Sequence, residues 1–354
     1  MMLDVIKIFL PTILAFMIGI AITPRVTDYM YKHRLWKKQA RKNADDITND
    51  AFKTVHNAEA EVSTPRVGGV IIWLSIIASI GVIWLISKVV PSDLSQKLDF
   101  YSRSQTLVPL GALLFGAGMG LIDDFIQIKG RGVYAGDNIS YRKIKILMVT
   151  LIALVIGGWF YFKLGMTGVA IPFTTHTLQL GWFFIPFFIL VMLAVFSGGV
   201  IDGMDGLAGG VLAVIFGAYA VIAFGKGQID IAAFCGVIAG AILAFLWFNI
   251  PPARFYMGET GIMGLLVTLT VIAFLTDTVL LLPLIALPLT ATVVSVVLQI
   301  GGYKYFGKRR LFKIAPLHHH FHALGWTREK VVMRYWVISV VCAILGVVIA
   351  LIGS

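Results

Sequence analysis

The stretch VIKIFLPTILAFMIGIAIT, from Val5 to Thr23, carries a single charge, Lys7, in an otherwise apolar run. A helix that crosses the core of a bilayer needs about 20 such residues. The run lacks a basic start and a small-residue cleavage site, and a strongly basic segment follows it. We therefore interpret it as a retained membrane span and not as a signal peptide.

Similar apolar runs recur along the whole chain and predict ten membrane spans. The ninth span contains Pro283 and Pro288, so we expect it to be kinked or broken. The fold class is an all-α polytopic membrane protein and, because no internal repeat is visible, residues 1–354 are expected to form a single integral membrane domain. The predicted spans begin near Val5, Val67, Thr106, Ile144, Gly181, Leu207, Ile229, Gly261, Thr278 and Met333.

The composition agrees with a membrane environment. Hydrophobic residues make up 58% of the chain and charged residues only 13%, about half the share typical of soluble domains. Cys235 and Cys342 both lie inside apolar runs, which predicts two buried, inert thiols and neither a disulfide nor a zinc site. Between the spans, residues 91–105 are expected to hold a short interfacial helix and residues 163–180 a small hairpin.

The positive charge marks one side of the membrane. Segments 24–66, 124–145, 250–260 and 302–334 hold 23 of the 29 Lys and Arg residues. By the positive-inside rule these segments are cytoplasmic, and both termini face outward. The net charge of +11 is then a topology signal and an attraction to anionic membrane lipid, so a nucleic-acid partner is not expected.

Two acidic motifs interrupt the apolar sequence. Asp123 and Asp124 end the third span, where adjacent carboxylates are unfavourable unless they meet water, cations or a metal. The loop between the fifth and sixth spans contains Asp202-Gly203-Met204-Asp205-Gly206, an irregular segment at membrane depth. Such backbone is tolerated where it is buried in protein or lines a wet cavity. These acids are candidates for binding a cation, phosphate or hydroxyl groups; a solvated helix end and an ordinary tight turn are the alternatives.

Two further motifs carry aromatic, acidic and histidine side chains. In the segment from Asn249 to Gly261, Tyr256 can stack on a nucleobase and Glu259 is a hard oxygen ligand, although a turn with a capping acid explains the pattern equally well. The run His318-His319-His320 cannot direct three rings at one metal from a helix or a strand. It suits recognition of phosphate or hydroxyl groups.

All four motifs fall in segments that the charge distribution places on the cytoplasmic side. Five acids beside Lys143, Arg254 and three histidines suit a divalent cation together with a phosphorylated substrate. We therefore predict one cytoplasmic cleft for magnesium-assisted phosphoryl transfer. A transporter is the alternative from another class, but carriers usually bind substrate near the membrane midplane between repeats.

The order of these motifs resembles the polyprenyl-phosphate sugar-phosphate transferases. The block from Phe312 to Phe321, with Gly325-Trp326 and Arg334-Tyr335-Trp336 after it, is similar to the phospho-N-acetylmuramoyl-pentapeptide transferase (translocase I) family. The resemblance implies ten spans in the bacterial cytoplasmic membrane and often a homodimer. It also implies attack of undecaprenyl phosphate on UDP-N-acetylmuramoyl-pentapeptide, giving lipid I and UMP with Mg²⁺ as the cofactor. The alternative interpretation is that the chain is a sister polyprenyl-phosphate N-acetylhexosamine phosphate transferase.

The resemblance also assigns roles to residues. Asp123 matches the catalytic acid that deprotonates the lipid phosphate, Asp124 its acidic partner in catalysis and at the metal, and Glu259 a magnesium-binding Asp. The positions implied for substrate binding are Lys143, Asp202, Asp205, Asn249, Tyr256, His318, His319 and His320.

The chain departs from the family pattern in several places. Glu259 and Tyr256 stand where the family has Asp and Phe, Gly199 replaces an Asn, Gln127 replaces a Lys, and Glu61 lies where a Lys is usual.

Overall fold

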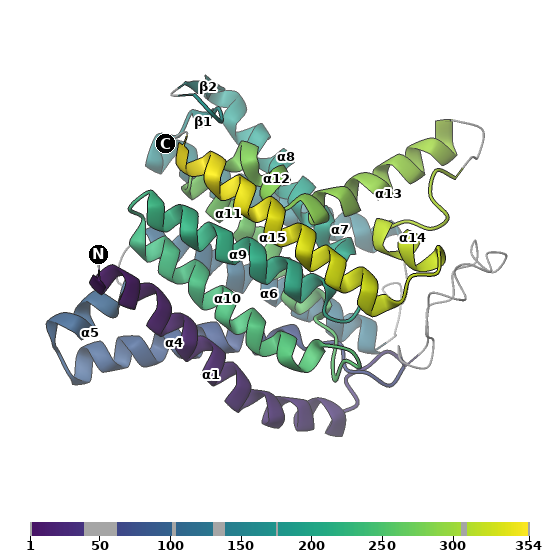
Figure 1. Cartoon of the computed structure of the whole chain (residues 1–354), viewed down its shortest axis with the longest axis horizontal. Coiled ribbons are helices and arrows are strands. Elements are labelled where there is room, and N and C mark those ends of the chain that lie inside the picture. Colours follow the sequence, from purple (N-terminus) through teal and green to yellow (C-terminus); the bar gives the residue numbers. More distant parts are fainter. Residues whose placement is uncertain are drawn as a thin grey trace.

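Long apolar helices account for most of the computed structural model (Figure 1). The structure describes residues 2–38, 62–100, 104–129, 139–174, 176–305 and 310–352. Its elements are α1 (Met2–Lys32), α4 (Gly69–Val89), α5 (Asp93–Leu98), α6 (Ser104–Lys129), α7 (Ile139–Leu164), β1 (Gly168–Ala170), β2 (Thr177–Gln179), η3 (Gly181–Phe183), α8 (Phe184–Phe196), η4 (Ser197–Ile201), α9 (Leu207–Gly225), α10 (Ile229–Asn249), α11 (Gly258–Leu275), η5 (Val279–Leu281), α12 (Leu282–Ile285), α13 (Leu287–Tyr305), α14 (Leu317–Ala323) and α15 (Arg328–Ile352).

The all-α polytopic fold predicted from the sequence is confirmed. Within the described ranges, nine helices are long and apolar enough to cross a membrane, and a bent helix pair is the tenth candidate. The first helix continues through Pro24 to Lys32, beyond the expected end at Thr23. The protein is therefore a polytopic membrane protein.

The ninth span is broken, as its prolines predicted. Its two parts, Val279–Ile285 and Leu287–Tyr305, meet at an angle of 87°. Pro288 is the second residue of α13, and its ring and missing N–H prevent α12 from continuing as one straight helix. In Figure 1, α13 consequently leaves the bundle and leads toward α14.

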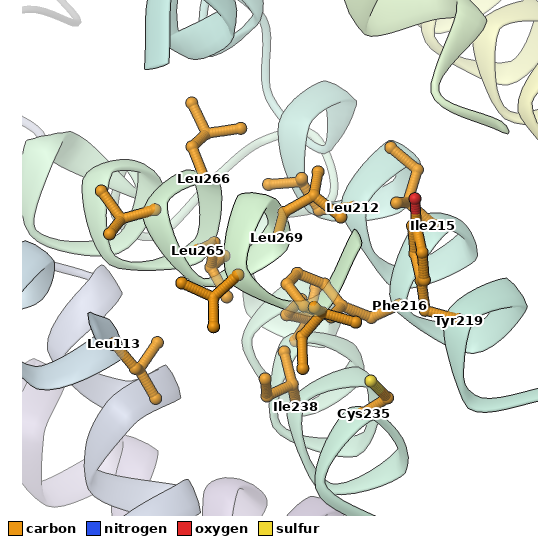
Figure 2. Packing of buried hydrophobic residues seen from close by; sticks show 14 of the residues in the cluster. Leu113, Leu212, Ile215, Phe216, Tyr219, Cys235, Ile238, Leu265, Leu266 and Leu269 are labelled. Carbon is orange, nitrogen blue, oxygen red and sulfur yellow. The ribbon is translucent and has the colours of Figure 1, made fainter. Parts of the chain in front are cut away.

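Helices α9, α10 and α11 form the interior of the bundle. They are hydrophobic on all sides, as expected for helices surrounded by other helices. Figure 2 shows leucine and isoleucine side chains of α9, α10 and α11 meeting around Phe216, with Cys235 nearby. Cys235 and Cys342 are both buried free thiols, as predicted.

Glycines allow α6 to lie directly against α11. A Cβ atom added at Gly120 would fall 2.0 Å from the carbonyl oxygen of Glu259, and one added at Gly116 would fall 2.9 Å from Cα of Gly264. Small residues of this kind permit close helix contact inside membranes. The contact brings the cytoplasmic end predicted for α6, with Asp123 and Asp124, against the first turn of α11.

The two extramembrane elements expected from the sequence are present. A short helix, α5, lies within the segment 91–105, and Ser92 caps it with a hydrogen bond from the backbone N–H of Ser95. Strands β1 and β2 form an antiparallel hairpin in which Val169 pairs with Leu178. The carboxylate of Asp277 accepts a hydrogen bond from the N–H of Ala170 and holds this hairpin to the end of α11.

Candidate functional site

Asp124 is buried and fastens α6 to α11. Its Oδ1 accepts a hydrogen bond from the N–H of Glu259 at 3.1 Å. Its Oδ2 accepts from the N–H and the Oγ1 of Thr260 at 2.8 and 2.7 Å. The first N–H groups of a helix have no partner within the helix, and a carboxylate is favoured at this positive end. Asp124 thus uses both of its oxygens to cap α11 and to place Glu259.

Asp123 points into a different environment from its neighbour. Its side chain is 1% exposed, its Oδ2 accepts a hydrogen bond from Gln127 at 3.0 Å, and it forms an ion pair with Lys145. The Lys145 ammonium also lies 3.2 Å from Oε1 of Glu259. One cation therefore joins two carboxylates that come from α6 and α11.

Lys145 was not singled out from the sequence, where Lys143 was the expected basic residue. Lys143 is exposed on α7, whereas Lys145 is partly buried against Asp123. Two residues correspond to about 200° of rotation on a helix, so the two side chains leave α7 on opposite faces. Only the packing of α7 decides which lysine reaches the acids.

The Asp202–Gly206 loop connects η4 with α9 beside these acids. Burial raises the pKa of Asp202 to about 7, and Glu259 adds to the rise, while Arg66 and the N–H of Gly258 oppose it. Burial also raises the pKa of Asp205, whose Oδ2 accepts a hydrogen bond from the N–H of Ala253 at 3.3 Å. Asp202 is thus the acid of the loop that lies with Glu259.

Asn249 holds two loops together from the end of α10. It is buried, its Oδ1 accepts a hydrogen bond from the N–H of Gly206 at 2.9 Å, and its Nδ2 donates to the carbonyl of Phe255 at 2.8 Å. Trp336 of α15 donates from Nε1 to the carbonyl of Gly206 at 3.1 Å. In this arrangement the amide of Asn249 is engaged with backbone groups, and its predicted role in substrate binding stays a prediction.

The segment containing Tyr256 pairs with the chain that precedes α4. The N–H of Tyr256 donates to the carbonyl of Pro65 at 2.8 Å, and its carbonyl accepts from the N–H of Gly68 at 2.9 Å. Gly258 has φ of +68°, and a Cβ atom there would fall 2.0 Å from the carbonyl oxygen of Arg66. These contacts bring Arg66 close to the acidic site and leave the Tyr256 side chain partly exposed. Stacking of Tyr256 on a nucleobase stays a prediction.

The histidine run lies in the first turn of α14. The ring centroids of His318 and His319 are 4.3 Å apart, and His320 has a different partner. His318 is completely buried, and burial lowers its pKa to about 3, so its imidazole is neutral. A Cβ atom at Gly203 would lie 2.4 Å from Nε2 of His318 and 3.0 Å from Nε2 of His319. His320 instead accepts a hydrogen bond through Nδ1 from the N–H of Lys313 at 3.1 Å. His318 and His319 therefore face the acidic loop, and His320 is held by its own segment.

Magnesium can be accommodated by this set of oxygen atoms. Among the described residues, no three His, Cys, Asp or Glu side chains are grouped closely enough to hold a metal ion alone. Mg²⁺ in phosphoryl-transfer sites commonly uses one or two carboxylates, with phosphate and water as the other ligands. Asp123 and Glu259 both contact the ammonium of Lys145. In the described structure the buried Oδ1 of Asp123 has no hydrogen-bond partner. These two carboxylates fit the ion. Asp124, which the sequence suggested as a metal ligand with Glu259, directs both oxygens at α11, and its role at the metal stays a prediction.

The four motifs predicted to form one site are brought together from residues far apart in the chain. Ends of α6, α7 and α11, the Asp202–Gly206 loop and α14 contribute to it. Lys143 is the predicted site residue that lies apart, because it is exposed. Glu61 lies outside the described residues.

The chain is similar to known proteins over most of its length. Residues 106–277 match the model of glycosyl transferase family 4. The chain is 34% identical to the phospho-N-acetylmuramoyl-pentapeptide-transferase of Bacillus velezensis, over 81% of this chain and 83% of that protein. It is 35% identical to the enzyme of the same name from Listeria monocytogenes, over 83% and 86% of the two chains. With the Bacillus mycoides enzyme the identity is 31% over 95% of both chains.

Proposed function

The chain belongs to the phospho-N-acetylmuramoyl-pentapeptide-transferase family of phospho-sugar transferases, and from this premise we propose its specific reaction. The protein transfers phospho-N-acetylmuramoyl-pentapeptide from its UDP-linked precursor to undecaprenyl phosphate, and the products are lipid I and UMP. It works in the bacterial cytoplasmic membrane with its site facing the cytoplasm. The observation that supports the proposal is the junction of Asp123, Lys145 and Glu259, three side chains that come from α6, α7 and α11.

Phosphoryl transfer needs a proton acceptor and a positive charge near the phosphates, and residues of the site can supply both. An oxygen of the lipid phosphate forms a bond to the phosphorus attached to the sugar, and the bond from that phosphorus to UMP breaks. Oδ1 of Asp123 is available to take a proton from the lipid phosphate. Bound Mg²⁺, held by Asp123 and Glu259, would neutralise phosphate charge.

Residues around the acids are suited to position the substrate. The neutral ring of His318 can donate one hydrogen bond and accept another, which suits phosphate or hydroxyl groups next to Gly203. Tyr256 offers an aromatic face to the uracil ring. Arg66 supplies positive charge beside Asp202. This charge can offset the two lysines of the family pattern that the sequence lacks at positions 61 and 127.

The test is an assay with the full chain in detergent, Mg²⁺, undecaprenyl phosphate and UDP-N-acetylmuramoyl-pentapeptide. UMP and lipid I should both form, and chelation of Mg²⁺ should stop both. Asp123→Asn should lose about 10²-fold or more of the turnover while still binding UDP precursor. Asp28→Asn, at an exposed position of α1, is the control and should retain turnover. Product from UDP-N-acetylglucosamine in place of the muramoyl precursor would contradict the assignment in favour of a sister transferase.

A further inference from the structure

Lys145 has a position that the proposed reaction leaves unexplained. Its ammonium pairs with Asp123 from α6 and lies 3.2 Å from Glu259 of α11, while the lysine itself belongs to α7. Elsewhere an apolar cavity of about 430 Å³ separates α6 from α7, lined by side chains such as Phe115 and Leu151. The polar junction at Lys145 is therefore distinct from the apolar boundary of the same two helices.

The two carboxylates at this junction need a positive charge. Asp123 is almost completely buried, and an isolated charge there would be strongly unfavourable. An ammonium between Asp123 and Glu259 satisfies this requirement, and a divalent cation between the same oxygens would do so too. Both cannot lie there together, because like charges a few ångströms apart repel strongly in partly buried surroundings.

We propose that the Lys145 ammonium and the divalent cation compete for the carboxylates of Asp123 and Glu259. Lys145 is thus a positioning residue that sets the affinity of the site for its cation, a conclusion that rests on the proposed function. A lysine suits this exchange, since its compact charge sits on a long flexible stem and can move to a phosphate oxygen. By thermodynamic linkage, an anionic substrate that attracts Lys145 then strengthens cation binding, and the cation strengthens substrate binding equally.

The departure at position 259 favours this exchange. Glu259 is one methylene longer than the Asp of the family pattern, and its Oε1 reaches the Lys145 ammonium. Gln127, which stands in place of a family lysine, donates a hydrogen bond to the same Oδ2 of Asp123 that Lys145 contacts. Among the described residues, Lys145 is therefore the cation paired with both acids.

The experiment measures Mn²⁺ binding to the full chain in detergent without nucleotide, by the loss of the free-ion electron paramagnetic resonance signal. Lys145→Met should bind Mn²⁺ at least about tenfold more tightly than the wild-type protein, because its competitor is gone. Lys145→Arg, which keeps the charge, should remain within about threefold of wild type. Lys143→Met, two residues away and exposed, is the control and should not change the Mn²⁺ affinity. Unchanged or weaker binding by a folded Lys145→Met protein would overturn the proposal.

A second measurement uses only the wild-type protein and so does not depend on the folding of a variant. Lysine side chains are labelled by reductive methylation with and without Mg²⁺, and the modified residues are quantified by mass spectrometry. Labelling of Lys145 should rise several-fold with Mg²⁺, while labelling of Lys143 stays constant. No rise at Lys145 contradicts competition. Lipid I formation by the same preparation tests the proposed function separately, so the two can fail independently.

Discussion

Adjacent residues at the end of α6 have different tasks. Asp124 accepts three hydrogen bonds from the start of α11, so its charge stabilises that helix and holds Glu259 in place. Asp123 instead pairs with Lys145 and keeps one oxygen without a partner in the described structure. In the Asp-Asp motif, Asp124 thus has a structural role, and the catalytic role of Asp123 stays a proposal.

Asp202 makes the stability of the protein depend on pH. Burial raises its pKa from 3.8 to about 7, so the folded chain holds a proton that the unfolded chain releases within this range. Stability associated with Asp202 is therefore present at low pH and is lost as the pH rises from 3.8 toward about 7. With divalent cations chelated, a change from about pH 5 to about pH 7.5 should lower the unfolding temperature of wild type more than that of Asp202→Asn.

The control for this prediction is Asp28→Asn at an exposed position. It should follow the pH dependence of the wild-type protein. Equal pH dependence of wild type and Asp202→Asn would show that another group is responsible.

Hydrogen bonds between loops fix the relative positions of the elements of the site. Asn249 connects the Asp202–Gly206 loop with the segment before α11, and Trp336 of α15 contacts the same loop at Gly206. Close backbone contact adds to these links: Gly203 leaves room for His318 of α14, and Gly258 leaves room for Arg66. The loops that carry the acids are thus positioned by α10, α14 and α15 and by the segment that precedes α4.

Loss of the two hydrogen bonds made by Asn249 should lower the stability of the protein and weaken substrate binding. Asn249→Ala leaves the N–H of Gly206 and the carbonyl of Phe255 without partners, at about 1–3 kcal/mol for each group that stays buried. Thermal unfolding in detergent should show the lower stability, and isothermal titration should show weaker binding of the UDP precursor. Asn249→Asp keeps the acceptor for Gly206 and should be intermediate. An Asn249→Ala protein as stable as wild type would contradict a stabilising role for these hydrogen bonds.

At the scale of the whole molecule, the acids, the histidine run and Lys145 gather at one end of the bundle. Figure 1 shows the two chain termini at the left and α14 at the right. Lys145 and α14 belong to the chain segments richest in Lys and Arg, which the positive-inside rule predicts to be cytoplasmic.

This arrangement predicts the orientation in the membrane. Alkaline phosphatase is active only outside the cytoplasm, and green fluorescent protein fluoresces only inside it. A phosphatase fused after Ser354 should be active, and one fused after Gly325 should be inactive, with the reverse result for the fluorescent protein. An active phosphatase after Gly325 would place the site on the outer side and contradict the cytoplasmic assignment.

The sequence by itself determined the helical class, the nine or ten candidate spans, the break near Pro288 and the motifs of the site. These features are local: hydropathy and length decide whether a segment can cross a bilayer, and proline interrupts a helix wherever it occurs. Only the tertiary structure decided that Lys145 and not Lys143 meets the acids, that Asp124 caps α11, and that His320 turns away from His318. These choices depend on the rotation and close approach of helices whose contacting residues are far apart in the chain, and no local pattern encodes them.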